Sequence, residues 1–256
     1  MENDENKFGL KKTYKTNLKD AAWLIYAFLK KPKLYTIASH EAIGGTINKN
    51  IFYNGGSLIY NGGSLIYYGS MGWYCRNVEG GNYPKFFLAL EDGEYNPDDV
   101  PKIPNSDILF YPKHTFTFNK KEFSETDVFD MLRNDQFALE GDSEIPKNQV
   151  IKFLGNKPLD PSRKKFNQYN CSFFENRNVL NPDVSDFLNI PNMVAIRYYF
   201  GFDDSDISHI QSNRIRIILI GVDKDGKNIA PENNLTVESN FLLQNSWPPP
   251  PPKRDT

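Results

Sequence analysis

The pattern of apolar and polar positions predicts one long helix near the start of the chain. This helix is expected over residues 18–31, and its middle is apolar on nearly every side, which indicates a buried element. Asn17 is a suitable N-cap, and Asp20 lies in the first turn, where the helix dipole favours an acidic side chain. Pro32 cannot continue the helix, so we expect it to end there.

Most of the other apolar segments have the pattern of strands. Tyr, Ile and Phe are dense over residues 34–90 and are interrupted by Gly and Asn, and residues 115–118 alternate as in a short strand. Apolar residues also alternate over 194–202, while 214–222 is apolar throughout its second half, which is typical of a central strand. Residues 223–226 then predict a turn in which Gly226 adopts a positive φ.

Short helices and loops are predicted for the remaining segments. Ser124 can cap a helix over 125–133, and further helical turns are expected at 147–154 and 183–188. Residues 91–112 contain four prolines and many acidic residues, so we expect a long loop there. Residues 156–178 are polar and irregular and are also expected to form no regular element.

These elements predict an α+β fold in which antiparallel sheet dominates and a few short helices pack against it. Short turns rather than crossover helices join the strands, which argues against a doubly wound sheet. We expect a mobile arm, a helix followed by a strand-rich part that contains a repeat, an α+β C-terminal part and a proline-rich tail. In this order, the four parts cover residues 1–12, 13–118, 119–245 and 246–256. The two middle parts could instead form one continuous domain.

Composition and charge narrow the classes of partner. Hydrophobic residues make up 39% of the chain, which is enough for a substantial core. The 30 basic and 32 acidic residues give a formal charge of −2, so nothing in the balance points to nucleic acid or to an anionic membrane. The most apolar stretch, residues 21–29, is shorter than the roughly 20 residues that a spanning helix needs. Two distant cysteines form no disulfide framework and the start resembles no signal peptide, so we expect a cytoplasmic protein.

A tandem repeat distinguishes the strand-rich part. The sequence NGGSLIY occurs at 54–60 and at 61–67, and a degraded third copy follows at 68–74. If each Asn-Gly pair forms a hairpin turn, Leu58 stands opposite Ile51 across the first turn and opposite Leu65 across the second. Two alternatives remain: the units stack as rungs of a solenoid, or a short duplication lengthens one hairpin of an ordinary sheet.

The chain contains few residues that suggest catalysis. His40-Glu41 fails the zinc-protease pattern, because position 44 is glycine where a second histidine is needed. Cys75 next to Arg76 lies in a strand-like run, which favours a buried structural thiol over a nucleophile. No spacing brings the three histidines, His40, His114 and His209, into a metal site.

Other charged residues have structural explanations. Asp223, Asp225 and Gly226 resemble a calcium loop, but the glycine is two positions too early and the twelfth residue is Asn234, so a hairpin turn is the better interpretation. An acidic loop holds Asp203, Asp204 and Asp206, and we expect it to be solvated. For Arg197, Arg214 and Arg216 we expect surface ion pairs with neighbouring aspartates rather than a binding face. No catalytic, cofactor-binding or metal-binding residue and no cofactor is therefore predicted.

A resemblance to other proteins rests on two segments and on the proline-rich end of the chain. The segments are IRYYFGFD (196–203) and IILIGVDKDGKNI (217–229). They are similar to the C-terminal part of small uncharacterised bacterial proteins. Those proteins combine an IRxYFG strand, a GVDxxGND hairpin and a proline-rich tail. The resemblance covers at most the last third of the chain, implies a bacterial source, and carries no activity and no site residues.

Two classes of function follow. We favour a non-catalytic structural or interaction protein that binds another protein or assembles with itself, as a homo-oligomer or a filament. Its interface is predicted in the repeat region, which is free of charge from Ile51 to Cys75. The residues expected there are Leu58, Ile59, Tyr60, Leu65, Ile66, Tyr67 and Tyr68.

The alternative is an enzyme whose site is assembled from scattered residues such as Cys75, His40, Glu41 and His114. The tail adds a second binding prediction. Five consecutive prolines favour an extended polyproline helix that can dock on a partner, starting with Trp247, Pro248, Pro249 and Pro250.

Overall fold

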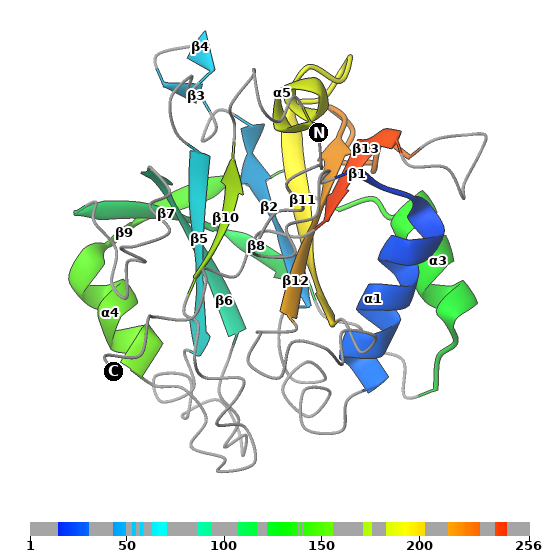
Figure 1. Ribbon diagram of the computed structural model, residues 1–256, viewed down its shortest axis with the longest axis horizontal. Coiled ribbons are helices and arrows are strands. Elements are labelled where there is room, and N and C mark those ends of the chain that lie inside the picture. Colours follow the sequence, from blue (N-terminus) through cyan, green and yellow to red (C-terminus); the bar gives the residue numbers. More distant parts are fainter. Residues whose placement is uncertain are drawn as a thin grey trace, which may run out of the picture.

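Two large antiparallel sheets, a small hairpin and four helices make up the described part of the computed structural model (Figure 1). All pairings between these strands are antiparallel, so the predicted α+β fold with dominant antiparallel sheet is confirmed. The structure describes residues 15–30, 43–49, 53–54, 57–58, 63–70, 86–93, 107–116, 122–137, 139, 141–155, 171–175, 183–202, 215–230 and 239–244.

The larger sheet contains strands from both ends of the chain. Its six strands follow the order β1-β13-β12-β11-β2-β8. The long central pair, β11 and β12, is joined over eight positions, from Ala195 opposite Val222 to Phe202 opposite Ile215. The bounds are β1 Lys15–Thr16, β13 Ser239–Gln244, β12 Ile215–Val222, β11 Ala195–Phe202, β2 Gly44–Asn48 and β8 His114–Phe116.

The second sheet contains most of the second repeat copy and the start of the third, in β5. Its five strands follow the order β10-β5-β6-β7-β9, and a separate two-stranded hairpin, β3-β4, precedes β5 in the chain. The bounds are β10 Cys171–Glu175, β5 Gly63–Ser70, β6 Phe86–Gly93, β7 Ile108–Pro112 and β9 Asp142–Pro146, with β3 at Tyr53–Asn54 and β4 at Ser57–Leu58.

Helices cover the two sheets on opposite sides of the molecule. In Figure 1, α1 and α3 lie beside the six-stranded sheet, and α4 lies at the far side of the five-stranded sheet. The short helix α5 packs near β13. Their bounds are α1 Leu18–Lys30, α3 Glu125–Asn134, α4 Lys147–Gly155 and α5 Asp183–Leu188, so all four predicted helices are confirmed.

The helix starts follow from side-chain capping, as predicted. The Oδ1 atom of Asn17 accepts a hydrogen bond of 2.8 Å from the backbone N–H of Asp20 at the start of α1. Ser124 and Asp127 form a reciprocal capping box at the start of α3. Such caps satisfy N–H groups that have no partner inside the helix and are typically worth about 1 kcal/mol each.

The main core lies between α1 and the six-stranded sheet and extends to the second sheet. Phe28 of α1 stacks on Phe200 of β11, with ring centroids 5.8 Å apart. Gly201 allows the close approach of this helix, because a Cβ atom there would lie 3.0 Å from the Cβ of Leu24. Leu90 of β6 belongs to the same buried cluster, so the core includes a strand of the five-stranded sheet.

Two expectations about the strands need correction. The predicted loop at 91–112 contains the end of β6 and all of β7, and the irregular segment 156–178 contains β10. The prolines misled the prediction because Pro112 is the last residue of β7 and lies beyond Phe110, the position at which β7 pairs with β6. Strand β11 is buried on both faces, with Ala195, Arg197 and Tyr199 on one face and Ile196 and Tyr198 on the other.

In the described part of the chain, no helix has the length and apolar character required to cross a bilayer.

Candidate functional site

The repeat region divides between two parts of the structure. Leu58 lies in β4, whereas Leu65, Ile66, Tyr67 and Tyr68 lie in β5. Ile59 and Tyr60 are outside the described residues. The described parts of the two repeat copies therefore lie in different strands. These strands do not place the two copies in equivalent positions.

The predicted meander is wrong in register and in partners. Tyr53 stands opposite Leu58 and Asn54 opposite Ser57, so the first hairpin is centred one residue later than expected. The sequence allows this register, because Asn54 is followed by two glycines and both Asn-Gly and Gly-Gly are two-residue hairpin sequences. Strand β5 pairs with β6 over eight positions instead of pairing with β4. A stack of like rungs is also excluded for these strands, because the partners of β5 lie outside the repeat and run antiparallel to it.

Strand β5, which contains most of the second repeat copy, is an interior strand of its sheet. On one side it pairs with β6 from Gly63 opposite Gly93 to Ser70 opposite Phe86. On the other side it pairs with β10 from Gly63 opposite Glu175 to Tyr67 opposite Cys171. The edge beside the repeat is therefore β10.

The edge strands of the two large sheets differ in how they are protected against pairing with another chain. Strand β9 contains Asp142, Glu144 and Pro146, and the Asp142 carboxylate accepts a hydrogen bond of 2.9 Å from the N–H of Asn48. Acidic residues and proline at a sheet edge disfavour pairing with another chain. Strands β1 and β8 contain two and three residues. Strand β10 contains five residues, CSFFE, of which one at the end is charged.

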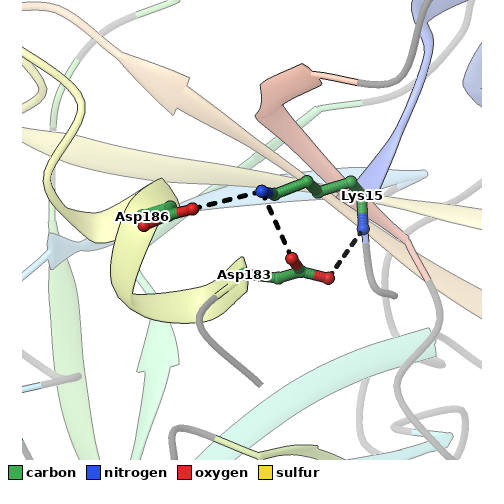
Figure 2. Close-up of polar contacts among 3 residues, drawn as sticks. All are labelled: Lys15, Asp183 and Asp186. Atoms are coloured by element: carbon green, nitrogen blue, oxygen red, sulfur yellow. Dashed lines mark hydrogen bonds and ion pairs between the residues drawn. The ribbon is translucent and has the colours of Figure 1, made fainter. Parts of the chain in front are cut away.

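A lysine and two aspartates fix the two-residue strand β1 (Figure 2). The Nζ atom of Lys15 lies 3.1 Å from Oδ2 of Asp186 and 3.4 Å from Oδ1 of Asp183, and its backbone N–H donates to Oδ2 of Asp183. Burial lowers the pKa of Lys15, but the hydrogen bonds and charges of the two aspartates outweigh burial and raise this pKa above its usual value. This cluster ties β1 to α5.

Arg197 forms the centre of a buried polar cluster, which corrects the expectation of surface ion pairs. The residue is 0% exposed and lies on the interior strand β11. Its guanidinium donates to Oγ1 of Thr46 at 3.3 Å, to the carbonyl of Gly226 at 2.9 Å and to Oδ1 of Asn228. It also lies 5.0 Å from the ring centroid of Phe137. Arg216 is buried too, and Arg214 is outside the described residues.

Asn228 continues the cluster towards α3. Its amide Nδ2 donates to the carbonyl of Leu132 at 2.9 Å and to the hydroxyl of Tyr199 at 3.0 Å. The Tyr199 hydroxyl in turn donates to Oδ2 of Asp135 at 3.4 Å. Burial raises the pKa of Tyr199 above its usual range, so this hydroxyl stays neutral. The cluster thereby connects β11, the turn after β12 and the end of α3.

Asp135 is the member of this cluster that changes charge near neutral pH. Burial raises the pKa of its carboxyl to about 6, and the Arg197 charge and the Tyr199 hydrogen bond oppose that rise. Such a value is compatible with proton transfer, yet its neighbours in the cluster are hydrogen-bond partners rather than a nucleophile. The arrangement supports positioning of the turn more directly than it supports catalysis.

The turn itself agrees with the prediction for 223–226. Gly226 has φ of +79°, and the Oδ1 atom of Asp223 accepts hydrogen bonds from the N–H groups of Asp225 and Lys227. Both bonds go to the same carboxylate oxygen, and they hold the turn closed. No group of three or more potential metal ligands is present among the described residues.

Most of the residues named for a catalytic site lie outside the described residues. His40, Glu41, Cys75 and His209 are outside the described residues, as are Asp203, Asp204 and Asp206. For His114 the structure gives the backbone, in β8, and Cys171 lies in β10. The tail from Trp247 through Pro250 is also outside the described residues.

Sequence reasoning missed Asp135, Tyr199, Asn228 and Thr46 as partners of Arg197. Thr46 is 151 positions from Arg197 and Asn228 is 31 positions away, so no local motif joins them. The useful signal was an arginine inside an apolar strand, because buried charges need partners.

Comparison with models of protein families, with curated proteins and with solved structures finds no match for this chain.

Proposed function

We propose that the protein is a non-catalytic interaction protein that binds a second copy of itself through the five-stranded sheet and the repeat. The observation that carries this proposal is the run from Ile51 to Cys75, which contains no charged residue. Charged side chains reduce the tendency of apolar, strand-forming segments to associate, and this run has none.

The composition of the run favours binding. Residues 54–70 consist mostly of Tyr, Ser, Gly and Asn, with Leu and Ile as the remainder. Tyrosine provides a large contact area at low conformational cost, and Ser, Gly and Asn adapt their hydrogen bonds to a partner. The same four residue types dominate the binding loops of antibodies for these reasons.

The position of β5 limits how the contact is made. Because β5 pairs with β6 and β10, a second copy meets the repeat at the faces of this sheet or at its outer strand. A bacterial source and a cytoplasmic location complete the proposal. Two cysteines, Cys75 and Cys171, are too few for the disulfide framework of a small secreted domain.

Light scattering and circular dichroism on the wild type and on Leu58→Lys and Leu65→Lys test the proposal. We expect the wild type to assemble and each lysine variant to shift towards a folded monomer, because a buried lysine needs a partner. Val194→Lys is the matched control, since Val194 is an exposed apolar residue (44%) next to the other sheet.

A wild type that stays monomeric at high concentration contradicts self-association. Lysine variants that unfold instead of dissociating show that the repeat serves the internal packing of the chain. If Val194→Lys reduces self-association as much as the repeat variants do, the loss is a general effect of an added charge and does not depend on the repeat.

A further inference from the structure

Residues 135–137, directly after α3, form a clasp with the turn after β12. The N–H of Phe137 donates to the carbonyl of Gly226, and the N–H of Asn228 donates to the carbonyl of Asp135, each over 3.1 Å. These two backbone hydrogen bonds define the clasp. It joins the end of a helix to a turn that is distant in the chain, and it lies outside both large sheets.

Asp135 belongs to the clasp and to the buried polar cluster at the same time. Its carbonyl accepts the clasp bond from the N–H of Asn228, and its carboxylate accepts the hydrogen bond of 3.4 Å from the Tyr199 hydroxyl. The amide side chain of Asn228 donates to the same hydroxyl. A change in the charge of the Asp135 carboxylate therefore acts directly on the two residues that form one of the clasp bonds.

The clasp can open while the rest of the fold stays in place. Asp135 is half-buried, so a displacement of residues 135–137 gives its carboxylate access to water. Helix α3 remains anchored by Val128 and Leu132, which are buried in the core, and β12 keeps its eight pairs with β11. A segment held by few hydrogen bonds opens at a lower free-energy cost than the whole domain.

We infer that the clasp is a proton-controlled device, which is closed when the Asp135 carboxyl is neutral and opens locally when this carboxyl is charged. The physical cause is hydration. A charged carboxylate loses favourable hydration in the closed clasp, whereas a neutral carboxyl loses much less. The inference concerns the conformation of a single chain and does not depend on self-association.

The groups around Asp135 determine the pH range of the device. Burial raises the pKa of Asp135 to about 6, while the charge of Arg197 and the hydrogen bond from Tyr199, both on β11, oppose this rise. From the turn, the Asp223 carboxylate acts on Arg197. The other charged residues of the turn, of the second half of α3 and of α1 are exposed: Lys224, Asp225, Lys227, Asp130, Arg133, Lys19, Asp20 and Lys30.

Native-state hydrogen exchange followed by NMR between pH 4 and 8 tests the inference. The amides of Phe137 and Asn228 report on the clasp. The amide of Phe200 is the reference, because it donates to the carbonyl of Ile43 at 2.9 Å from the interior strand β11. Protection is compared after correction for the intrinsic pH dependence of exchange.

We expect the clasp amides to be less protected than Phe200 at every pH and to lose further protection above pH 6. The difference between a pKa of about 6 and the ordinary value of 3.8 limits this further loss to about a hundredfold, which solvent screening reduces to roughly tenfold. Low concentrations of urea should accelerate exchange at Phe200 and not at the clasp, because local opening exposes little surface.

Three variants identify the titrating group. Asp135→Asn keeps the shape of the side chain and should make protection of the clasp independent of pH. Asp130→Asn, the matched change at an exposed position of the same helix, should keep the pH dependence of the wild type. Tyr199→Phe should move the midpoint to higher pH, because the charged carboxylate loses a hydrogen bond that favours it.

Two results would overturn the inference. If the clasp amides have the protection and the urea dependence of Phe200, they exchange only by unfolding of the whole chain and the clasp does not open locally. If the pH dependence persists in Asp135→Asn, or if its midpoint is unchanged in Tyr199→Phe, the Asp135 carboxyl does not control the clasp.

Discussion

Arg197 shows how much one residue contributes to the geometry of this protein. Its guanidinium reaches Thr46 on β2, Asn228 after the turn and the carbonyl of Gly226, all in the interior. A planar group with several fixed donors can satisfy acceptors on three segments at once, which a lysine ammonium on a flexible stem does less well. The side chain thereby holds the turn after β12 against β2.

We therefore expect Arg197→Lys to destabilise the fold by about 2–4 kcal/mol, because buried acceptors lose their donors. Arg133→Lys is the matched control at an exposed position of α3 and should cost about 0.5 kcal/mol or less. Urea unfolding followed by circular dichroism measures both. Equal midpoints for the two variants would show that the cluster around Arg197 contributes little to stability.

Asp135 predicts a pH dependence of stability. Its folded pKa of about 6 lies above the ordinary value of 3.8, so the folded state keeps a proton that the unfolded chain has already released. Its stabilising contribution is complete below about pH 4 and is lost as the pH rises through 6. Asp135→Asn should remove this loss and stabilise the protein at pH 7.5 by on the order of 1 kcal/mol, after allowance for solvent screening.

Thermal unfolding of the wild type and of Asp135→Asn between pH 4 and 8 measures this effect. Asp130→Asn, an exposed change on the same helix, is the control. A pH profile of Asp135→Asn that is parallel to the wild type would exclude Asp135 as its source.

At the scale of elements, the turn after β12 depends on a glycine for two separable reasons. Gly226 has φ of +79°, and a Cβ atom there would overlap the carbonyl oxygen of Phe137. Gly141, before β9, has φ of +72°, but a Cβ atom there would have no neighbouring heavy atom within 4 Å. The two glycines thus share the backbone conformation and differ in the space around them.

We expect Gly141→Ala to cost about 1 kcal/mol, the usual effect of a left-handed alanine, and Gly226→Ala to cost several kcal/mol. The larger loss follows because Phe137 must move, which breaks its hydrogen bond of 3.1 Å from its N–H to the carbonyl of Gly226. Chemical denaturation of both variants gives the difference. Equal losses would show that backbone strain alone makes glycine necessary at 226.

At the scale of the whole molecule, segments distant in sequence share each sheet. Strands β1, β2 and β8 from the first half complete a sheet whose centre, β11 and β12, lies in the second half. Lys15 secures β1 through the two aspartates of α5, which are 168 and 171 positions away. Stability should therefore respond as one unit to changes at either end of the chain.

The proline-rich tail gives a prediction at this scale. A polyproline segment needs little ordering on binding, so Trp247 and the prolines after it are suited to dock on another protein or on a neighbouring copy. Deletion of Pro248–Thr256 should weaken self-association or remove a copurifying partner, as measured by sedimentation and by pull-down. Deletion of Lys253–Thr256 alone is the control that retains the prolines. Unchanged assembly and unchanged partners after the longer deletion would contradict a docking role.

Local chemistry in the sequence determined most helices, the central strands and the turn. Asn17 and Ser124 mark helix starts because their side chains accept bonds from N–H groups within three residues. The apolar run of β12 predicted a central strand because only neighbours on both sides and both faces can bury it. Gly226 was predicted from a property of its own backbone.

Only the tertiary structure decided which strands meet and which polar groups are buried together. The repeat predicted a meander, yet β5 pairs with β6 and β10, because longer ladders with distant segments outweigh a short local hairpin. Arg197, Asn228 and Asp135 form one cluster although no spacing connects them. Strand register and buried hydrogen bonds depend on partners that the folded chain brings together, and a single sequence names those partners only where they are close in the chain.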